Sequence, residues 1–271
     1  MRKRLLTTRR LNVKSKTHSN ASLNRNVGSL LINNFIIYYT NKQSAEEIYE
    51  EVFNKKLYDF ETDNKNPFII DGGSNIGISM LFFKNKFPSA KMLCFEPDPN
   101  AFRMLQKNVE VNNIKNVMLV NAALSNKTGY THFYGEVDGE EPDARGNSII
   151  KVWGNQRKNS AKILVKTVQL SSYIDSKVDF LKLDIEGAEQ QVLEEIEQKL
   201  SLVVALGIEV HEAKKMELIN HSKTIYQILK QQRYELEFLS QDILRELPKQ
   251  IENWVKKTDP KFYLIRGKRQ L

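Results

Sequence analysis

The ten residues FIIDGGSNIG, at positions 68–77, decide the fold of this chain. An apolar run ends in an acid, and three of the twelve glycines in the chain follow it directly. Glycines after a strand let a ligand approach the backbone and let the next helix start close to that strand. The first turn of such a helix presents unpaired N–H groups to the ligand. The stretch therefore predicts a strand, a ligand-binding turn and a helix.

Apolar segments with a strand pattern recur along the chain, and helical segments separate several of them. The best-marked helix has Asp98 as its N-cap, Pro99 at its first position, and an apolar stripe at Phe102, Leu105 and Val109. Strands and helices that alternate at this spacing predict an α/β fold: a mostly parallel, seven-stranded sheet with helices on both faces. The seven predicted strands are 67–71, 91–96, 116–124, 178–184, 202–210, 234–240 and 261–267.

The charges of the chain are divided unevenly between its beginning and the rest. The net charge of +8 comes from the first 26 residues, which hold eight basic residues and no acid, so the remainder has 33 bases and 33 acids. We therefore expect no nucleic-acid partner for the body of the protein. No apolar stretch approaches the ~18 residues of a membrane span. We expect a cytoplasmic protein, with organelle targeting by the basic leader as the alternative.

The glycine spacing separates two classes of nucleotide ligand. A dinucleotide site has the pattern G-x-G-x-x-G, whereas the stretch that begins at Asp71 reads D-x-G-x-N-x-G. An acid beside the phosphates of a dinucleotide is unfavourable, but it suits the amino group of a sulfonium amino acid. Asn75 stands where glycine is common, and asparagine tolerates left-handed backbone angles. We assign the cofactor loop to Asp71, Gly72, Gly73, Ser74, Asn75 and Gly77.

The next two predicted strand ends carry groups for the other parts of such a ligand. Glu96 ends the second strand, where a carboxylate can accept hydrogen bonds from both ribose hydroxyls. Asn121 and Ala122 follow the third, where they would border an adenine ring. The ends of three successive strands thus carry groups suited to bind an amino acid, a ribose and a base. Together they describe S-adenosylmethionine.

The fourth and fifth predicted strands end in a second group of polar residues. Alternation along a strand puts Lys182 and Asp184 on one face of the fourth, and Glu209 and His211 on one face of the fifth. If these strands are neighbours, the four residues gather with Glu186 beside the cofactor loop. Such groups could deprotonate a hydroxyl, hold a hard divalent ion, or form a structural pair with the lysine. Our candidate catalytic residues are Asp184, Glu186, Glu209 and His211, and we assign no metal ligand.

At this point the sequence resembles the FkbM family of S-adenosylmethionine-dependent methyltransferases. The segments IIDGGSNIG, CFEPDPNAFRMLQKNVEVN, VNAALS, VQLSSYI, VDFLKLDIEGAEQQVL and IEVH carry the resemblance, in that order, over about residues 60–240. It implies a Rossmann-like methyltransferase fold with a last antiparallel strand inserted into the sheet. It also implies O-methylation, often of sugar hydroxyls or polyketide-type natural products, with Asp184 and Glu186 at the junction of cofactor and substrate.

These observations combine into one expected organisation and activity. We expect a basic leader at 1–27, an extension at 28–60 that packs on the core, and a methyltransferase domain at 61–271, within which 128–170 form antiparallel hairpins. The expected acceptor is a hydroxyl of a small molecule or glycan. Two alternatives stay open: a nucleotide-dependent oxidoreductase on a similar sheet, against which the glycine spacing argues, and a non-catalytic binding protein targeted by its leader.

Overall fold

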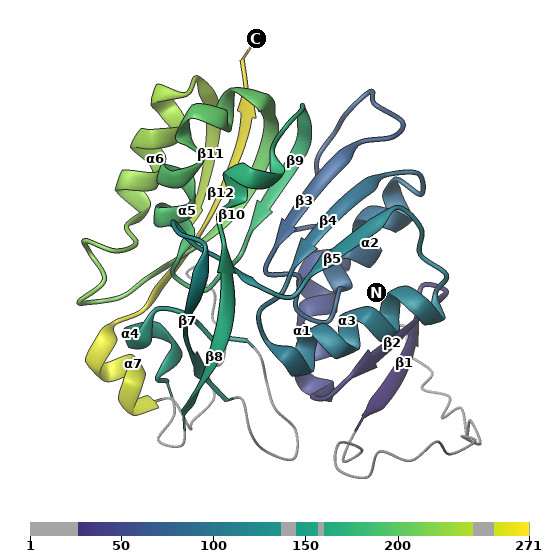
Figure 1. Cartoon of the computed structure of the whole chain (residues 1–271), viewed down its shortest axis with the longest axis horizontal. Coiled ribbons are helices and arrows are strands. Elements are labelled where there is room, and N and C mark those ends of the chain that lie inside the picture. Colours follow the sequence, from purple (N-terminus) through teal and green to yellow (C-terminus); the bar gives the residue numbers. More distant parts are fainter. Residues whose placement is uncertain (1–26, 137–144, 157–159, 241–251, 271) are drawn as a thin grey trace, which may run out of the picture.

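A seven-stranded sheet forms the centre of the computed structural model, which describes residues 27–136, 145–156, 160–240 and 252–270 (Figure 1). The strands are ordered β11-β12-β10-β9-β3-β4-β5. All seven coincide with predicted strands. In chain order they are β3 (Phe68–Gly72), β4 (Lys91–Phe95), β5 (Val117–Val120), β9 (Val178–Leu183), β10 (Val203–Glu212), β11 (Tyr234–Ser240) and β12 (Lys261–Arg269).

The sheet is mixed, so the prediction of a mostly parallel sheet is only partly right. Strands β5, β4, β3, β9 and β10 pair in parallel, as βαβ crossovers require. Strand β12 runs antiparallel to both of its neighbours, β10 and β11. The chain re-enters the sheet in the reverse direction after β11 and occupies the position between two parallel strands. The antiparallel insertion that the family resemblance implied is therefore present.

Helices cover both faces of the sheet, because the strand residues that point to one face and those that point to the other are both apolar. Ile69 and Phe180 belong to a core with α2 (Ile78–Lys86) and α3 (Pro99–Val111). Their chain neighbours, Ile70 and Leu181, belong to a second core with α5 (Glu189–Glu195) and α6 (Ser222–Gln231). Every residue of β9 is buried, as expected for a central strand with two covered faces.

A short N-terminal assembly packs on the α2 and α3 side of the sheet. It consists of the antiparallel hairpin β1 (Gly28–Ile32) and β2 (Phe35–Tyr39), then α1 (Lys42–Tyr49) and the π-helical turn η1 (Glu50–Asn54). The side chain of Asn108 on α3 accepts a hydrogen bond from the backbone N–H of Tyr38 at 2.6 Å and donates one to its carbonyl at 3.0 Å. Figure 1 shows this hairpin alongside α3.

A second, three-stranded sheet stands at the carboxyl ends of the central strands. It is ordered β6-β8-β7, with β6 (Ala123–Leu124), β7 (Gly129–Gly135) and β8 (Ala161–Val168). The antiparallel pairing of β7 and β8 agrees with the prediction for 128–170, but residues 151–154 of that region form the helix α4 instead of a strand. The predicted third strand is thus divided, because β5 ends at Val120 and the chain then leaves the central sheet. The remaining helices and turns are α4 (Lys151–Gly154), η2 (Leu170–Tyr173), η3 (Glu197–Leu202) and α7 (Glu252–Thr258).

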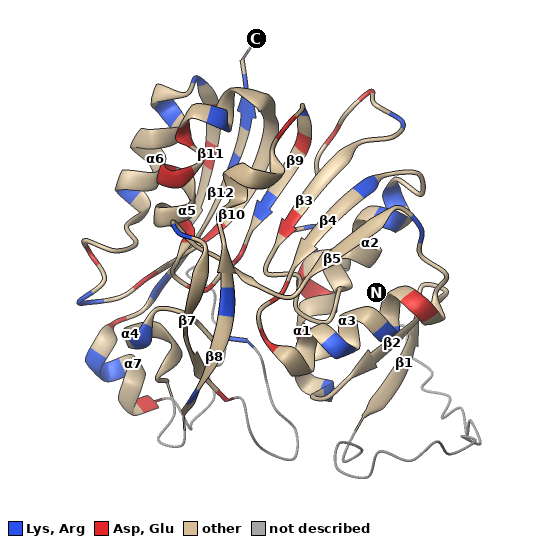
Figure 2. Cartoon of the chain, in the orientation of Figure 1, with Lys and Arg blue, Asp and Glu red and all other residues tan. Residues whose placement is uncertain are grey.

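Charged residues are spread over the described surface. In Figure 2, basic and acidic positions are interspersed along the helices and strands. The described helices are all too short or too polar to cross a lipid bilayer.

Candidate active site

One pocket opens at the carboxyl ends of β3, β4, β9 and β10. It is open to solvent at its mouth. The glycine loop, the end of β4 and the β5–β6 link form one end. The ends of β9 and β10 form the other, together with the N-terminal segment around Tyr58 and the residues after β7. Parallel strands thus bring their carboxyl ends to one opening, as expected for an α/β sheet.

The loop after β3 is held tightly against the neighbouring strands. The N–H groups of Gly73 and Ser74 donate to the carbonyl of Phe95, at 3.0 and 2.9 Å. Gly73 has φ +78°, and a Cβ placed on it would lie 1.8 Å from the carbonyl oxygen of Asp184. Only glycine fits both restrictions. Asn75 also adopts a left-handed conformation, with φ 50°, in agreement with its place in the predicted pattern.

The remaining glycines of the predicted loop differ in exposure to the pocket. Gly72 ends β3, and a Cβ there would meet the side chains of Leu124 and Leu183 at 2.9 Å. Gly77 has φ 92° and caps α2, against Leu105. Gly73, Ser74 and Asn75 line the pocket, whereas Gly72 and Gly77 do not. The two outer glycines therefore shape the turn, and the three inner residues form its accessible edge.

Asp71 lies under the pocket and does not line it. Its side chain is fully buried on the α2 side of β3, where Ser79 Oγ donates to Oδ2 at 2.6 Å. Lys182 Nζ lies 3.2 Å from Oδ1, and forms an ion pair with it. The expectation that Asp71 faces the amino group of a ligand is therefore corrected. Alternation along β3 points this carboxylate into the protein, where the lysine of the adjacent strand β9 neutralises it.

Lys182 makes several polar contacts in this buried region. Besides Asp71, it contacts Asp184 Oδ2 at 3.5 Å and donates to the carbonyls of Gly72 and Gly73 at 3.2 and 2.9 Å. Burial lowers the pKa of Lys182, but Asp71 and Asp184 raise it more, and the net shift is upward. The lysine therefore stays charged and ties the glycine loop to β9. Sequence reasoning named it only as a structural partner of a carboxylate, and the structure shows that pair.

Glu96 borders the pocket at the end of β4. Its Oε2 accepts from the N–H of Asn75 at 2.7 Å and its Oε1 accepts from the N–H of Asp98 at 2.8 Å. The side chain is only 5% exposed. Burial, and then the nearby Asp98 carboxylate, raise the pKa of Glu96 to about 8. A further hydrogen-bond donor that enters the pocket would stabilise the ionised form of this carboxyl group.

The two residues expected to border an adenine ring lie differently. Ala122 is buried and lines the pocket with Phe95 and Leu124, which together form an apolar wall. Asn121 does not line it. Its Nδ2 donates to the carbonyls of Glu96 and Pro97, at 2.8 and 3.3 Å. The expectation for Asn121 is therefore corrected: the chain turns away from the sheet after β5, and this amide braces the backbone that presents Glu96.

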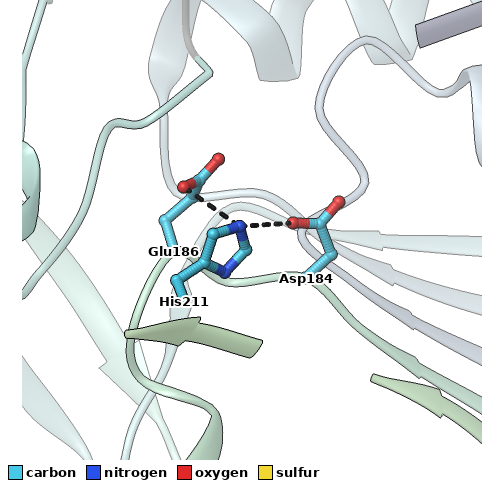
Figure 3. Close-up of side chains that lie close together, drawn as sticks. All are labelled: Asp184, Glu186 and His211. Atoms are coloured by element: carbon cyan, nitrogen blue, oxygen red, sulfur yellow. Dashed lines mark ion pairs between the residues drawn. The ribbon is translucent and has the colours of Figure 1, made fainter. Parts of the chain in front are cut away.

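The four candidate catalytic residues come together at the opposite end of the pocket. Strands β9 and β10 are parallel neighbours, which confirms the condition set by the sequence. His211 Nε2 lies 3.4 Å from Glu186 Oε2 and 3.9 Å from Asp184 Oδ1 (Figure 3). It also lies 3.8 Å from Glu209 Oε1. The three acids line the pocket, and the imidazole, 1% exposed, lies behind them.

These carboxylates change the chemistry of the histidine. Burial by itself lowers the pKa of His211, but Glu186, Glu189 and Glu209 raise it to about 10 overall. In the absence of a ligand, the imidazole is therefore protonated at neutral pH. A protonated histidine holds negative charge on its neighbours and cannot itself take a proton from a hydroxyl. The groups that can accept a proton here are the pocket-lining carboxylates.

Tyr58 belongs to this cluster although no sequence signal marked it. Its hydroxyl donates to Glu209 Oε2 at 2.9 Å and lies 3.1 Å from Asp184 Oδ2. Burial and these two acids raise the pKa of Tyr58 well above its usual value. The residue follows η1, outside the alternating strand–helix region. Tyr58 therefore serves as a neutral donor that aligns two carboxylates.

A strained turn presents Glu186. This residue and Gly187 both have positive φ, 56° and 97°. The Glu186 carboxylate accepts from the N–H of Gly146 at 2.9 Å and from Trp153 Nε1 at 2.6 Å. Both donors belong to the segment after β7. A non-glycine residue in the left-handed region costs of order 1 kcal/mol, and such outliers gather at functional sites. The turn thus directs one acid toward the imidazole and the pocket.

Comparison with known proteins places these features in context. Residues 71–236 match the model of the methyltransferase FkbM domain. The methyltransferase sdnD of Sordaria araneosa is 32% identical over 196 residues, which cover 60% of this chain and 73% of that protein. The 31-O-demethyl-FK506 methyltransferase FkbM of Streptomyces tacrolimicus is 26% identical over 213 residues, 67% of this chain and 80% of that protein. The crystal structure of M. jannaschii TYW2 in complex with AdoMet has the same fold, with a TM-score of 0.50, 11% identity, and coverage of 93% and 90%.

Proposed function

This chain belongs to the FkbM methyltransferase family, and we propose that it transfers the methyl group of S-adenosylmethionine to a hydroxyl oxygen of a sugar, glycan or small natural product. Family membership makes the chain a methyltransferase, and it implies S-adenosylmethionine as the methyl donor. It argues against an oxidoreductase on a similar sheet and against a non-catalytic binding protein. The relative named as acting on 31-O-demethyl-FK506 supports an oxygen acceptor.

The residues at the β4 end of the pocket fit the donor. Glu96 is nearly buried yet borders the pocket, and ribose hydroxyls would supply hydrogen bonds to its carboxylate. The wall formed by Phe95, Ala122 and Leu124 would contact an apolar base. The edge of the glycine loop, Gly73 to Asn75, would lie along the amino-acid part. When bound, this cofactor supplies an activated methyl group on a positively charged sulfur.

The opposite end of the pocket fits a hydroxyl acceptor. Asp184 and Glu209 line the pocket, and both lie near the hydroxyl of Tyr58, so they are placed to receive the proton of a neighbouring hydroxyl. The protonated His211 behind them holds negative charge on this side. Transfer in line with the sulfur requires the acceptor oxygen at a defined position, and fixed carboxylates provide such positioning.

One observation carries the proposal. A single pocket holds, at one end, the loop and carboxylate suited to a nucleoside cofactor and, at the other, carboxylates suited to accept a proton. A dinucleotide oxidoreductase would require a phosphate-binding loop, whereas the loop here lies above a buried acid, Asp71.

The proposal is tested with a deuterated-methyl cofactor. The protein is incubated with this donor and a panel of glycans and natural products that carry free hydroxyls, and the products are analysed by mass spectrometry. We expect a three-deuterium tag on an oxygen of one compound class, and no tag with the Glu96→Ala variant. A tag on nitrogen or carbon would contradict the oxygen acceptor. Lack of S-adenosylhomocysteine binding in calorimetry would contradict the cofactor site.

A further inference from the structure

We propose that Asp184, Glu186 and His211 bind a divalent cation such as Mn²⁺ at the acceptor end of the pocket. Each of these residues offers one ligand atom, and the three atoms lie within 4.8 Å of one another. The residues come from the end of β9, the strained turn that follows it, and β10 (Figure 3). The binding site stands on this geometry, and only its role in catalysis rests on the proposed function.

The orientation of His211 is that of a metal ligand. Its Nδ1 lies 3.0 Å from Glu189 Oε1, and Glu189 is fully buried. Glu189 is itself fixed, because it accepts from the N–H groups of Ile185 and Gly187. Histidines that bind metals commonly donate their other ring N–H to a carboxylate, which sets the tautomer. Here that arrangement directs Nε2, on a side chain 1% exposed, at the acids that line the pocket. A bound cation would take the place of the Nε2 proton, because a histidine binds metal through a deprotonated ring nitrogen.

The spacing of the ligand atoms also fits a shared cation. His211 Nε2 lies 3.4 Å from Glu186 Oε2 and 3.9 Å from Asp184 Oδ1. Both distances exceed the usual ~2.7–3.2 Å of an N–H···O hydrogen bond. Two ligands at ~2.1 Å from an octahedral cation are about 3 Å apart at right angles and about 4.2 Å apart when opposite. Both separations from Nε2 lie between these two values.

The charge around the cluster favours a cation. Glu209 Oε1 lies 3.8 Å from Nε2 and adds a third carboxylate, while Lys182 is shared between Asp71 and Asp184. A set of carboxylate oxygens with one imidazole nitrogen suits Mn²⁺. The side chains of Asp184 and Glu186 are 27% and 20% exposed, on the pocket side. A bound cation would therefore face the acceptor and could take its hydroxyl as a ligand, which makes that proton easier to remove.

Mn²⁺ binding to the full chain tests the inference without any substrate. After removal of metals with a chelator, the protein is titrated with MnCl₂, and free Mn²⁺ is measured by electron paramagnetic resonance. We expect one Mn²⁺ per chain, bound tighter than about 1 mM. Glu186→Gln keeps the shape of the side chain and should weaken binding at least tenfold. Glu189→Gln, which alters the support of His211 and of the turn that carries Glu186, should weaken it about 10–100-fold.

The control is Asp175→Asn, which removes the same charge from a side chain that is 87% exposed and remote from the pocket. It should leave Mn²⁺ affinity unchanged, and circular dichroism checks that each variant is folded. Lack of Mn²⁺ binding at about 1 mM, or equal affinity in wild type and Glu186→Gln, would overturn the inference. Calorimetry with S-adenosylhomocysteine separates the two proposals: cofactor binding without Mn²⁺ binding removes the cation site alone, and Mn²⁺ binding without cofactor binding removes the proposed function alone.

Discussion

Replacement of Lys182 by methionine should destabilise the protein severely. The lysine and Asp71 form a buried ion pair, with side chains 2% and 0% exposed. Removing one partner leaves an uncompensated buried charge, which costs about 3–5 kcal/mol. The substitution also leaves the carbonyl of Gly73 without its 2.9 Å donor, which adds about 1–3 kcal/mol. We expect the free energy of unfolding of Lys182→Met to fall by about 4–6 kcal/mol, allowing for overlap of these effects.

A second substitution, at Asp71, tests whether its unpaired charge causes this loss of stability. Asp71→Asn in the Lys182→Met background removes the orphaned charge, so it should restore about 2–3 kcal/mol. Asp71→Asn alone should cost less than Lys182→Met, because the lysine keeps Asp184 at 3.5 Å. The measurement is urea unfolding of all four proteins, followed by the fluorescence of the two tryptophans. A cost below about 1 kcal/mol for Lys182→Met, or a double variant no more stable than the single one, would refute the reasoning.

Three further predictions concern the pocket and its loop. Burial raises the pKa of Glu96 to about 8, and the carboxylate accepts hydrogen bonds best when it is ionised. The affinity for S-adenosylhomocysteine, measured by calorimetry, should therefore rise up to about tenfold from pH 7 to 9. Glu96→Gln should bind more weakly and show no such increase with pH. Gly73→Ala places a Cβ 1.8 Å from a backbone oxygen and should lower unfolding free energy by about 2–4 kcal/mol, whereas Gly129→Ala, with no atom within 4 Å, should cost less. Tyr58→Phe removes a hydroxyl that serves two carboxylates and should cost about 2–3 kcal/mol in urea unfolding; equal stability of Tyr58→Phe and the exposed control Tyr130→Phe would contradict this.

The parts of the fold that depend on local pattern could be predicted from sequence. Apolar runs located all seven strands of the central sheet. The cap at Asp98 located the start of α3, where its side chain accepts from the N–H groups of Asn100 and Ala101. The direction of β12 has no local signal, because it depends on how the chain returns after β11. Only the resemblance to a known family indicated that the last strand is antiparallel.

The candidate site was predictable to the level of strand ends and no further. Alternation correctly grouped Glu209 with His211, because it depends on the backbone alone. It did not tell whether Asp71 points into the pocket or into the core, since that depends on which residue the adjacent strand places opposite. Tyr58 was missed because its partners lie 126 and 151 residues away, and no periodicity connects such positions.

The wall that the N-terminal segment gives to the pocket has a consequence for how relatives diverge. Five of its residues line the pocket, and all precede the region, 71–236, that matches the family: Ile48, Glu51, Val52, Leu57 and Tyr58. Substitutions in this segment change the wall of the pocket and leave the glycine loop and Glu96 unchanged. Exchange of this segment between relatives, with the rest of each chain kept, is therefore a direct way to change the wall of the pocket.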